Sequence, residues 1–209
     1  MRSRNHNGRS ESGAALVEFA MVLPLLVLLF IGIASFGFAF KQKLLVSNAV
    51  QTAARTGSSL GQNVGADMAV LDSIQQGFSG LPDNGDTLVT KVTIYKADSS
   101  GNVDGNLINT YIYLPGGGCD WNPCPNPSSD TDESNIGGAW LPSIRDVDLI
   151  GEPVGNVDSE ALDKMGVTIY YGHDWVLGRY GFLPDLPCNT DGSQCWTETS
   201  IHRLEPAGS

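Results

Sequence analysis

Residues 14–40 read AALVEFAMVLPLLVLLFIGIASFGFAF, and Glu18 is the only charged residue among them. About 20 helical residues cross the roughly 30 Å hydrocarbon core of a bilayer, so this segment is long enough to span a membrane with some tilt. The sequence therefore predicts a transmembrane helix at 14–40.

The charges of the chain lie almost entirely outside this apolar segment. The 209 residues carry 12 Lys and Arg against 23 Asp and Glu, a formal net charge of −11. From Leu44 to Ser209 the balance is seven against 21. Nucleic-acid binding needs clustered cations that displace counterions from phosphates, so we expect no nucleic-acid partner. An ordinary soluble cytosolic enzyme is also disfavoured.

The flanks of the segment indicate its orientation. Residues 1–13 are a short polar leader with three arginines, whereas Lys41 and Lys43 follow on the other side. Cationic flanks tend to stay in the cytoplasm, although a bias of three to two is small. We expect a single pass through the plasma (inner) membrane, with a cytoplasmic leader and residues 41–209 outside.

Three interpretations of the segment compete. A cleaved signal peptide would use the small-x-small site Gly37-Phe38-Ala39, but a signal core has 7–15 residues and this one is about twice as long. A plain anchor would leave Glu18 as a carboxylate that reaches the interface. A type IV pilin-like segment explains more of these features together.

The third interpretation comes from a resemblance to a known family. Residues 13–26 read GAALVEFAMVLPLL, residues 37–40 read GFAF and residues 48–57 read NAVQTAARTG. Over about residues 10–57 the chain resembles TadE-like proteins, which are pseudopilins of the tight-adherence (Tad, or Flp) pilus system. The resemblance implies a non-catalytic protein of pilus assembly. Its implied partners are other pilus subunits, the Tad assembly platform and a prepilin peptidase.

The resemblance also implies proteolytic processing. Prepilin peptidases of this class cut on the cytoplasmic side, after a glycine that precedes the apolar run. Carried over to this chain, the cut falls between Gly13 and Ala14 and makes Glu18 the fifth mature residue. Phe19 becomes the sixth, where Flp pilins carry Tyr, so the aromatic body is kept and the hydroxyl is lost.

A carboxylate such as Glu18 in an apolar segment needs a positively charged partner. A carboxylate costs roughly 2.5–3.5 kcal/mol at the centre of a bilayer and less near its edge. Cleavage after Gly13 would create an α-amine on Ala14, one helical turn from Glu18, so the amine of the same or of a neighbouring helix can meet the carboxylate. Pro24 removes a helical hydrogen bond and is expected to kink the helix. We expect Glu18, Phe19 and Pro24 to serve assembly.

The chain beyond the membrane predicts an α+β, pilin-like fold. Apolar residues recur at helical spacing after Lys43, so one helix is expected from about 14 to 58, and a second at about 66–78. A short helix capped by Asp158 is expected to end near Gly166. Runs rich in β-branched residues predict a small antiparallel sheet, with strands at 87–96, 107–114, 167–171 and 194–204 and a long irregular loop at 115–139. The expected parts are a leader (1–13), a transmembrane helix (14–40), a helical region (41–82) and a β domain with disulfide loops (83–209).

Four cysteines lie in the expected extracytoplasmic part. An even number outside the cytoplasm favours disulfides, and four cysteines allow three connectivities. Local pairing would close two short loops, worth roughly 2–2.5 kcal/mol each in the chain-entropy model. A zinc site is the rival, but only the first pair has suitable spacing. The four residues are Cys119, Cys124, Cys188 and Cys195.

No residue set indicates catalysis. His173 follows an expected strand without a recognisable nucleophile, so a turn histidine is the better interpretation. Residues 130–135 offer calcium-friendly oxygens but lack the EF-hand glycine and its terminal Glu, which favours a solvated acidic loop. We expect no cofactor, no metal and no small-molecule substrate. Four tryptophans in or beside loops are either core fillers or contacts to partners: Trp121, Trp140, Trp175 and Trp196.

Together these observations predict a minor pilin or pseudopilin. The alternative is an unprocessed, single-pass, membrane-anchored binding protein that faces away from the cytoplasm. A membrane-tethered enzyme is a third class, and the sequence offers no residues for it.

Overall fold

The computed structural model describes residues 8–80, 88–116, 118–129, 131–147, 162–173 and 188–205. The described chain divides between Phe40 and Lys41 into an apolar helical unit and an α+β domain. Both contain part of α1 (Gly8–Leu60), which is one continuous helix of 53 residues.

The long helix expected from about 14 to 58 is confirmed, and it is longer at both ends. It begins in the polar leader at Gly8. It ends at Leu60 because Gly61 takes a left-handed conformation (φ +51°) and donates its N–H to the carbonyl of Gly57 (3.1 Å). Gly61, which directly follows Leu60 in the sequence, is the local signal for this end.

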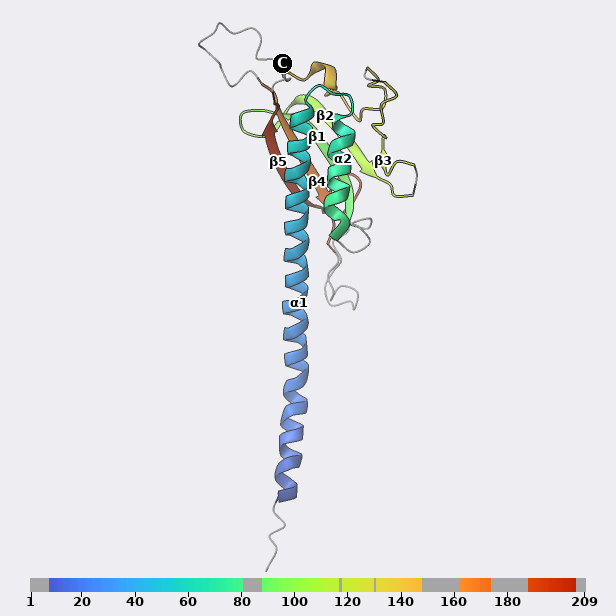
Figure 1. Cartoon of the computed structure of the whole chain (residues 1–209). Helices are drawn as coiled ribbons and strands as arrows, with labels where there is room; N and C mark the ends of the chain where they lie inside the picture. Colours follow the sequence, from blue (N-terminus) through green and yellow to red (C-terminus); the bar gives the residue numbers. More distant parts are fainter. Residues whose placement is uncertain are drawn as a thin grey trace, which may run out of the picture. The chain divides into compact units, whose positions relative to one another are not determined.

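α2 (Ala66–Gly77) follows after a short turn and continues into the 3-10 helix η1 (Phe78–Gly80). In the domain, α2 and the last turns of α1 lie on the same face of the sheet (Figure 1). The two helices approach closely at Gly77, where a Cβ would lie 2.5 Å from the Cβ of Ala49. A glycine at this position therefore lets the helices pack.

The sheet has five antiparallel strands in the order β3-β2-β1-β4-β5, so the expected α+β class is confirmed. β1 and β4 are central, and every strand except the two-residue β3 has at least eight residues. The strands are β1 (Val89–Ala97), β2 (Val103–Tyr113), β3 (Trp121–Asn122), β4 (Lys164–Tyr171) and β5 (Trp196–Arg203).

Three local expectations differ from the structure. β2 begins at Val103 rather than 107, so residues 103–106 extend the expected strand at its start. β3 lies inside the segment expected to be an irregular loop. The expectation of a short helix that ends near Gly166 is wrong at its end, because residues 164–166 are strand residues that pair with both β1 and β5. The expected cap of that helix, Asp158, lies outside the described residues. Pairing on two sides outweighs a local helix signal.

The core of the domain lies between the helices and the sheet. It receives every third or fourth residue of the helices and alternate residues of the strands, as the two periods require. Its largest fully buried apolar side chains are Trp140, Tyr111, Tyr171, Leu71, Ile74, Ile94, Met165, Ile169 and Leu204. The short 3-10 helix η3 (Pro142–Ile144) follows Trp140. Both lie in the described segment 131–147, which is called the covering loop below.

Candidate membrane anchor and assembly site

The N-terminal unit presents an apolar surface that no described part of the chain covers. Sixteen large apolar side chains between Leu16 and Phe40 are 42–76% exposed. Monomeric soluble proteins rarely expose contiguous apolar patches of more than a few hundred Å². Among the described residues, one helix is long and apolar enough to cross a membrane, and it is α1. α1 therefore fits a single-pass membrane anchor.

The expected processing and assembly residues all lie in the first turns of this helix. Ala14 and Glu18 are four residues apart in α1, so they lie on one face of the helix. The Glu18 side chain is exposed, and the described residues offer it no ion-pair partner within 4 Å. Phe19 is 58% exposed. α1 passes through Pro24 without ending.

Gly13 has no structural reason to be glycine in this chain. It lies within α1, where glycine costs about 1 kcal/mol relative to alanine. A Cβ at this position would meet no atom within 4 Å, and its φ is not in the left-handed region. Gly77 differs, because its missing Cβ makes room for Ala49.

A polar cluster joins α1, where it enters the domain, to the residues that follow β4. Gln42 is buried, and its amide donates to the carbonyl of Gly172 (3.0 Å) while its Oε1 contacts Nδ1 of His173. The His173 ring stacks on Trp196 with 5.2 Å between centroids. His173 is thus a buried structural residue (4% exposed) rather than a turn histidine at the surface.

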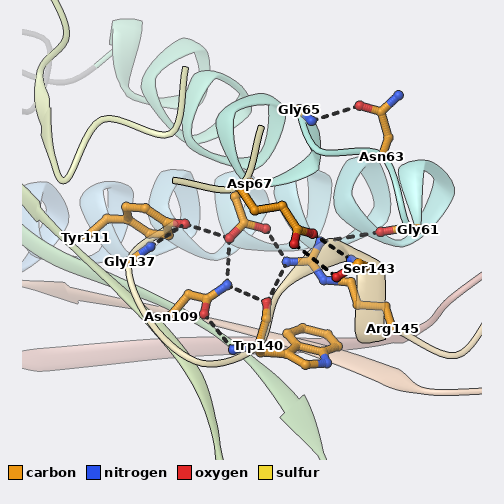
Figure 2. Close-up of polar contacts among 11 residues, drawn as sticks. Gly61, Asn63, Gly65, Asp67, Asn109, Tyr111, Gly137, Trp140, Ser143 and Arg145 are labelled. Carbon is orange, nitrogen blue, oxygen red and sulfur yellow. Dashed lines mark hydrogen bonds and ion pairs between the residues drawn. The ribbon is translucent and has the colours of Figure 1, made fainter. Parts of the chain in front are cut away.

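A second and larger polar network is fully buried in the domain. Asp67, in the first turn of α2, forms an ion pair with Arg145 (2.5 Å), and both side chains are completely buried. The same carboxylate accepts hydrogen bonds from Asn109 Nδ2 (2.8 Å) and from the Tyr111 hydroxyl (2.6 Å). Figure 2 shows how these side chains converge on Asp67 from β2 and from the loop around Trp140.

The remaining contacts of this network fasten the covering loop. Arg145 donates to the carbonyls of Gly61 and Trp140 (both 3.3 Å), and its guanidinium lies 4.6 Å from the centroid of the Trp140 ring. Asn109 and the Trp140 backbone exchange two hydrogen bonds (2.8 and 3.0 Å). The network joins α2, the end of α1, β2 and the loop, and it leaves Asp67 fully paired.

Sequence reasoning missed this network, although one signal for it existed. Asn109 and Tyr111 occupy alternate positions of a predicted strand, which is the spacing of a single face, and the neighbours on that face are apolar. A polar Asn in a buried row needs a partner. The identity of that partner was not readable, because Asp67 and Arg145 are 78 residues apart.

Burial and pairing shift several pKa values in the domain. Burial, with the neighbouring Asp67 carboxylate, raises the pKa of Tyr111 well above its usual range. Burial raises the pKa of Tyr171 to about 12, with a contribution from Glu198. The hydrogen bond to Asp163 raises the pKa of Lys96, whose Nζ lies 2.8 Å from that carboxylate. None of these groups opens onto a catalytic cleft in the described part of the chain.

The four cysteines form the two local disulfides. Cys119 is bonded to Cys124, and Cys188 to Cys195, so each bond closes a short loop. Thiolates engaged in disulfides are not zinc ligands, which removes the rival interpretation for these sulfurs.

The acidic loop is ordered by its own hydrogen bonds. The Asp132 carboxylate accepts bonds from both the backbone and the hydroxyl of Ser128 and of Ser134, which hold its pKa well below its usual range. Glu133 accepts two bonds from Ser143. Asp130 lies outside the described residues. Within the described ranges, no group of three or more His, Cys, Asp or Glu residues could hold a metal ion.

The tryptophans divide between core and border. Trp121 and Trp140 are buried core residues, and Trp196 is partly buried against the core. Trp175 lies outside the described residues.

An open groove of about 270 Å³ between α1 and α2 is lined by uncharged residues, so it carries no acid–base pair.

Comparison with known proteins adds one finding to this geometry. Neither the curated proteins nor the solved structures include a significant match to the chain. One family model matches about a fifth of it, over the apolar part of α1 and its first turns in the domain. Residues 13–55 match the family described as TadE-like protein, so the N-terminal segment of this chain is TadE-like.

Proposed function

We propose that the protein is a minor pilin or pseudopilin that takes part in the assembly of a Tad (Flp-type) type IV pilus. The observation that carries the proposal is the TadE-like match, because it falls on the helix whose apolar side chains are exposed. On this account the protein binds and assembles with other subunits and performs no catalysis. Its partners are the membrane, other pilus subunits and the Tad assembly platform.

We propose that a prepilin peptidase cuts the chain between Gly13 and Ala14. The proposal rests on the resemblance of residues 13–26 to the family's processing site, and packing within the chain places no other demand on this glycine. The leader with its three arginines stays in the cytoplasm, and the α+β domain lies outside. The new α-amine on Ala14 lies within reach of a carboxylate at Glu18.

In this proposal Glu18 directs assembly rather than insertion. An exposed carboxylate in an apolar helix is costly in lipid, and a protonated amine from a neighbouring subunit neutralises it. Such a pairing fixes the axial position of one helix beside the next. Phe19 and Pro24 lie in the same apolar helix and complete the residues assigned to assembly.

A Glu18→Ala variant tests this role. The variant should still insert into the membrane, because it loses a charge from an apolar segment, but it should no longer support pilus formation. Pili counted by electron microscopy, with membrane fractionation of the same cells, measure both properties. The matched control is Glu11→Ala, which removes an acidic residue from the leader.

Normal pilus numbers with Glu18→Ala would contradict the assembly role. That result, together with an uncut N-terminus, would favour the alternative of an unprocessed, membrane-anchored binding protein.

A further inference from the structure

The two edges of the sheet differ in how the chain covers them. At the β2 edge, Thr110 donates its N–H to Gly137 (3.0 Å), Ala139 donates to Ile108 (3.2 Å), and β3 covers the end of the strand. β5 forms the opposite edge (Figure 1). Within the described part of the chain, residues 197–203 have no backbone hydrogen bond on their outer side.

β5 has the properties of a strand that can accept another. It pairs with β4 over eight consecutive residues without a register shift, and it contains neither proline nor a bulge. Natural edge strands are usually shortened, kinked or covered, because their free N–H and C=O groups are a template for a further strand. Proteins that recognise extended peptides use this kind of edge.

The end of this edge carries two basic residues without an acidic partner. Lys164 and Arg203 lie directly opposite each other on β4 and β5. Neither has a carboxylate within 4 Å in the described ranges, although the domain as a whole is strongly acidic. Like charges directly opposite each other destabilise a sheet. A carboxylate on an added strand would relieve this repulsion.

The side chains of β5 disfavour a second copy that pairs antiparallel with this edge. Pairing of β5 with β5 places the same face of each strand side by side when the joint sheet is continuous. The face of β5 that carries Arg203 has no carboxylate to offer a second copy. Its residues are Thr197, Thr199, Ile201 and Arg203.

We propose that the outer edge of β5 binds an extended segment of a different protein as a sixth strand, with an acidic side chain beside Arg203 and Lys164. The backbone of residues 197–203 supplies the hydrogen bonds, and the basic pair selects the charge. The inference is independent of the proposed role in a pilus.

The test uses the full chain in lipid nanodiscs and two synthetic peptides. Both peptides alternate Thr and Val over eight residues and carry a fluorophore; one has Asp and the other Lys at the second position, which lies opposite Arg203 when the peptide pairs antiparallel with residues 197–203. The Asp peptide should bind roughly tenfold more tightly by fluorescence anisotropy. Arg203→Glu should reverse this preference. Arg55→Glu, which makes the same charge change on an exposed face of α1, should leave it unaltered.

Two further experiments separate edge binding from general charge attraction. N-methylation of alternate backbone amides of the Asp peptide should abolish its binding, because strand addition needs those N–H groups and charge attraction does not. Benzoylphenylalanine at Thr197 in membranes of the host should form adducts that Arg203→Glu reduces.

Equal binding of the two peptides, or unchanged preference in a folded Arg203→Glu variant, would overturn the proposal. A cross-linked product with twice the mass of the chain would replace the different protein with a second copy. Peptide binding does not depend on cleavage at Gly13, so its failure and that of the pilus role can be told apart.

Discussion

Asp67 and Arg145 form the buried ion pair on which the packing of α2 and the covering loop depends. Both side chains are completely buried, and the carboxylate also accepts bonds from Asn109 and Tyr111. Removal of one partner of such a pair leaves an uncompensated charge in a low-dielectric core, which is far more costly than the pair itself.

Arg145→Met should lower the free energy of unfolding by about 3–5 kcal/mol. Urea unfolding followed by tryptophan fluorescence measures this loss. Lys43→Met is the control, because its ion pair with Glu198 is much more exposed (59% for the Lys43 side chain) and should cost about 1 kcal/mol or less. A loss below about 1 kcal/mol for Arg145→Met would contradict the structural role of the network.

The raised pKa values of two tyrosines predict an alkaline loss of stability. Tyr171, with a pKa of about 12, and Tyr111, whose pKa is raised further, keep their protons in the folded state above pH 10. The unfolded chain loses these protons near pH 10, so it binds fewer protons than the folded chain between about pH 10 and 12. The free energy of unfolding should therefore fall as the pH rises through this interval.

Absorbance at 295 nm, which follows the deprotonation of tyrosine, tests the raised pKa values of these two tyrosines directly. Of the six tyrosines, a fraction should titrate late in the folded protein and near pH 10 in urea. Tyr171→Phe should remove part of the late fraction. Identical titration curves with and without urea would show that the two hydroxyls are not buried as described.

Contacts between residues far apart in the sequence could not be predicted from it. Composition predicts that Leu, Val and Phe fill a membrane segment and that four extracytoplasmic cysteines form disulfides. It does not predict that Arg145 lies under Trp140, because that contact depends on the path of a loop. Nor did the sequence reveal that His173 is buried against Gln42, since 131 residues separate the two.

At the scale of elements, the contact between α1 and α2 depends on a single glycine. Alanine normally stabilises a helix by about 1 kcal/mol relative to glycine. At Gly77, however, the added Cβ would lie 2.5 Å from the Cβ of Ala49, so the helices must separate. Gly77→Ala should therefore destabilise the domain by about 1–3 kcal/mol.

Chemical denaturation of the full chain in detergent measures this effect. Gly80→Ala is the control, because its Cβ would meet only Leu45 at an ordinary 3.7 Å. If Gly77→Ala proves as stable as Gly80→Ala, the close approach of the helices is wrong.

Elements with strong periodicity were predictable, and those set by long-range pairing were not. α2, β1 and β5 follow local patterns of apolar residues and were expected within a few positions, as was the end of α1, which begins six residues before its expected start. The first residues of β4 were expected to be helical, because a local cap signal preceded them. Their conformation is decided instead by β1 and β5, which pair with them from both sides.

On the scale of the whole molecule, the chain combines a lipid-type helix with an acidic domain that has its own core. The helix is long and apolar enough to cross a membrane, and most of it lies within the TadE-like match at residues 13–55. Within the described residues, the β2 edge of its sheet is covered and the β5 edge pairs with no further strand. These features support a subunit that is held in the membrane and makes its contacts outside it.

The central claim is that this chain is processed as a prepilin-type subunit. The most direct test is the N-terminal sequence of the mature protein isolated from membranes of its own host. The account predicts a chain that begins at Ala14, with Glu18 as its fifth residue. A chain that begins at Met1, or one that begins at Phe40 after removal of the entire apolar segment, would contradict it.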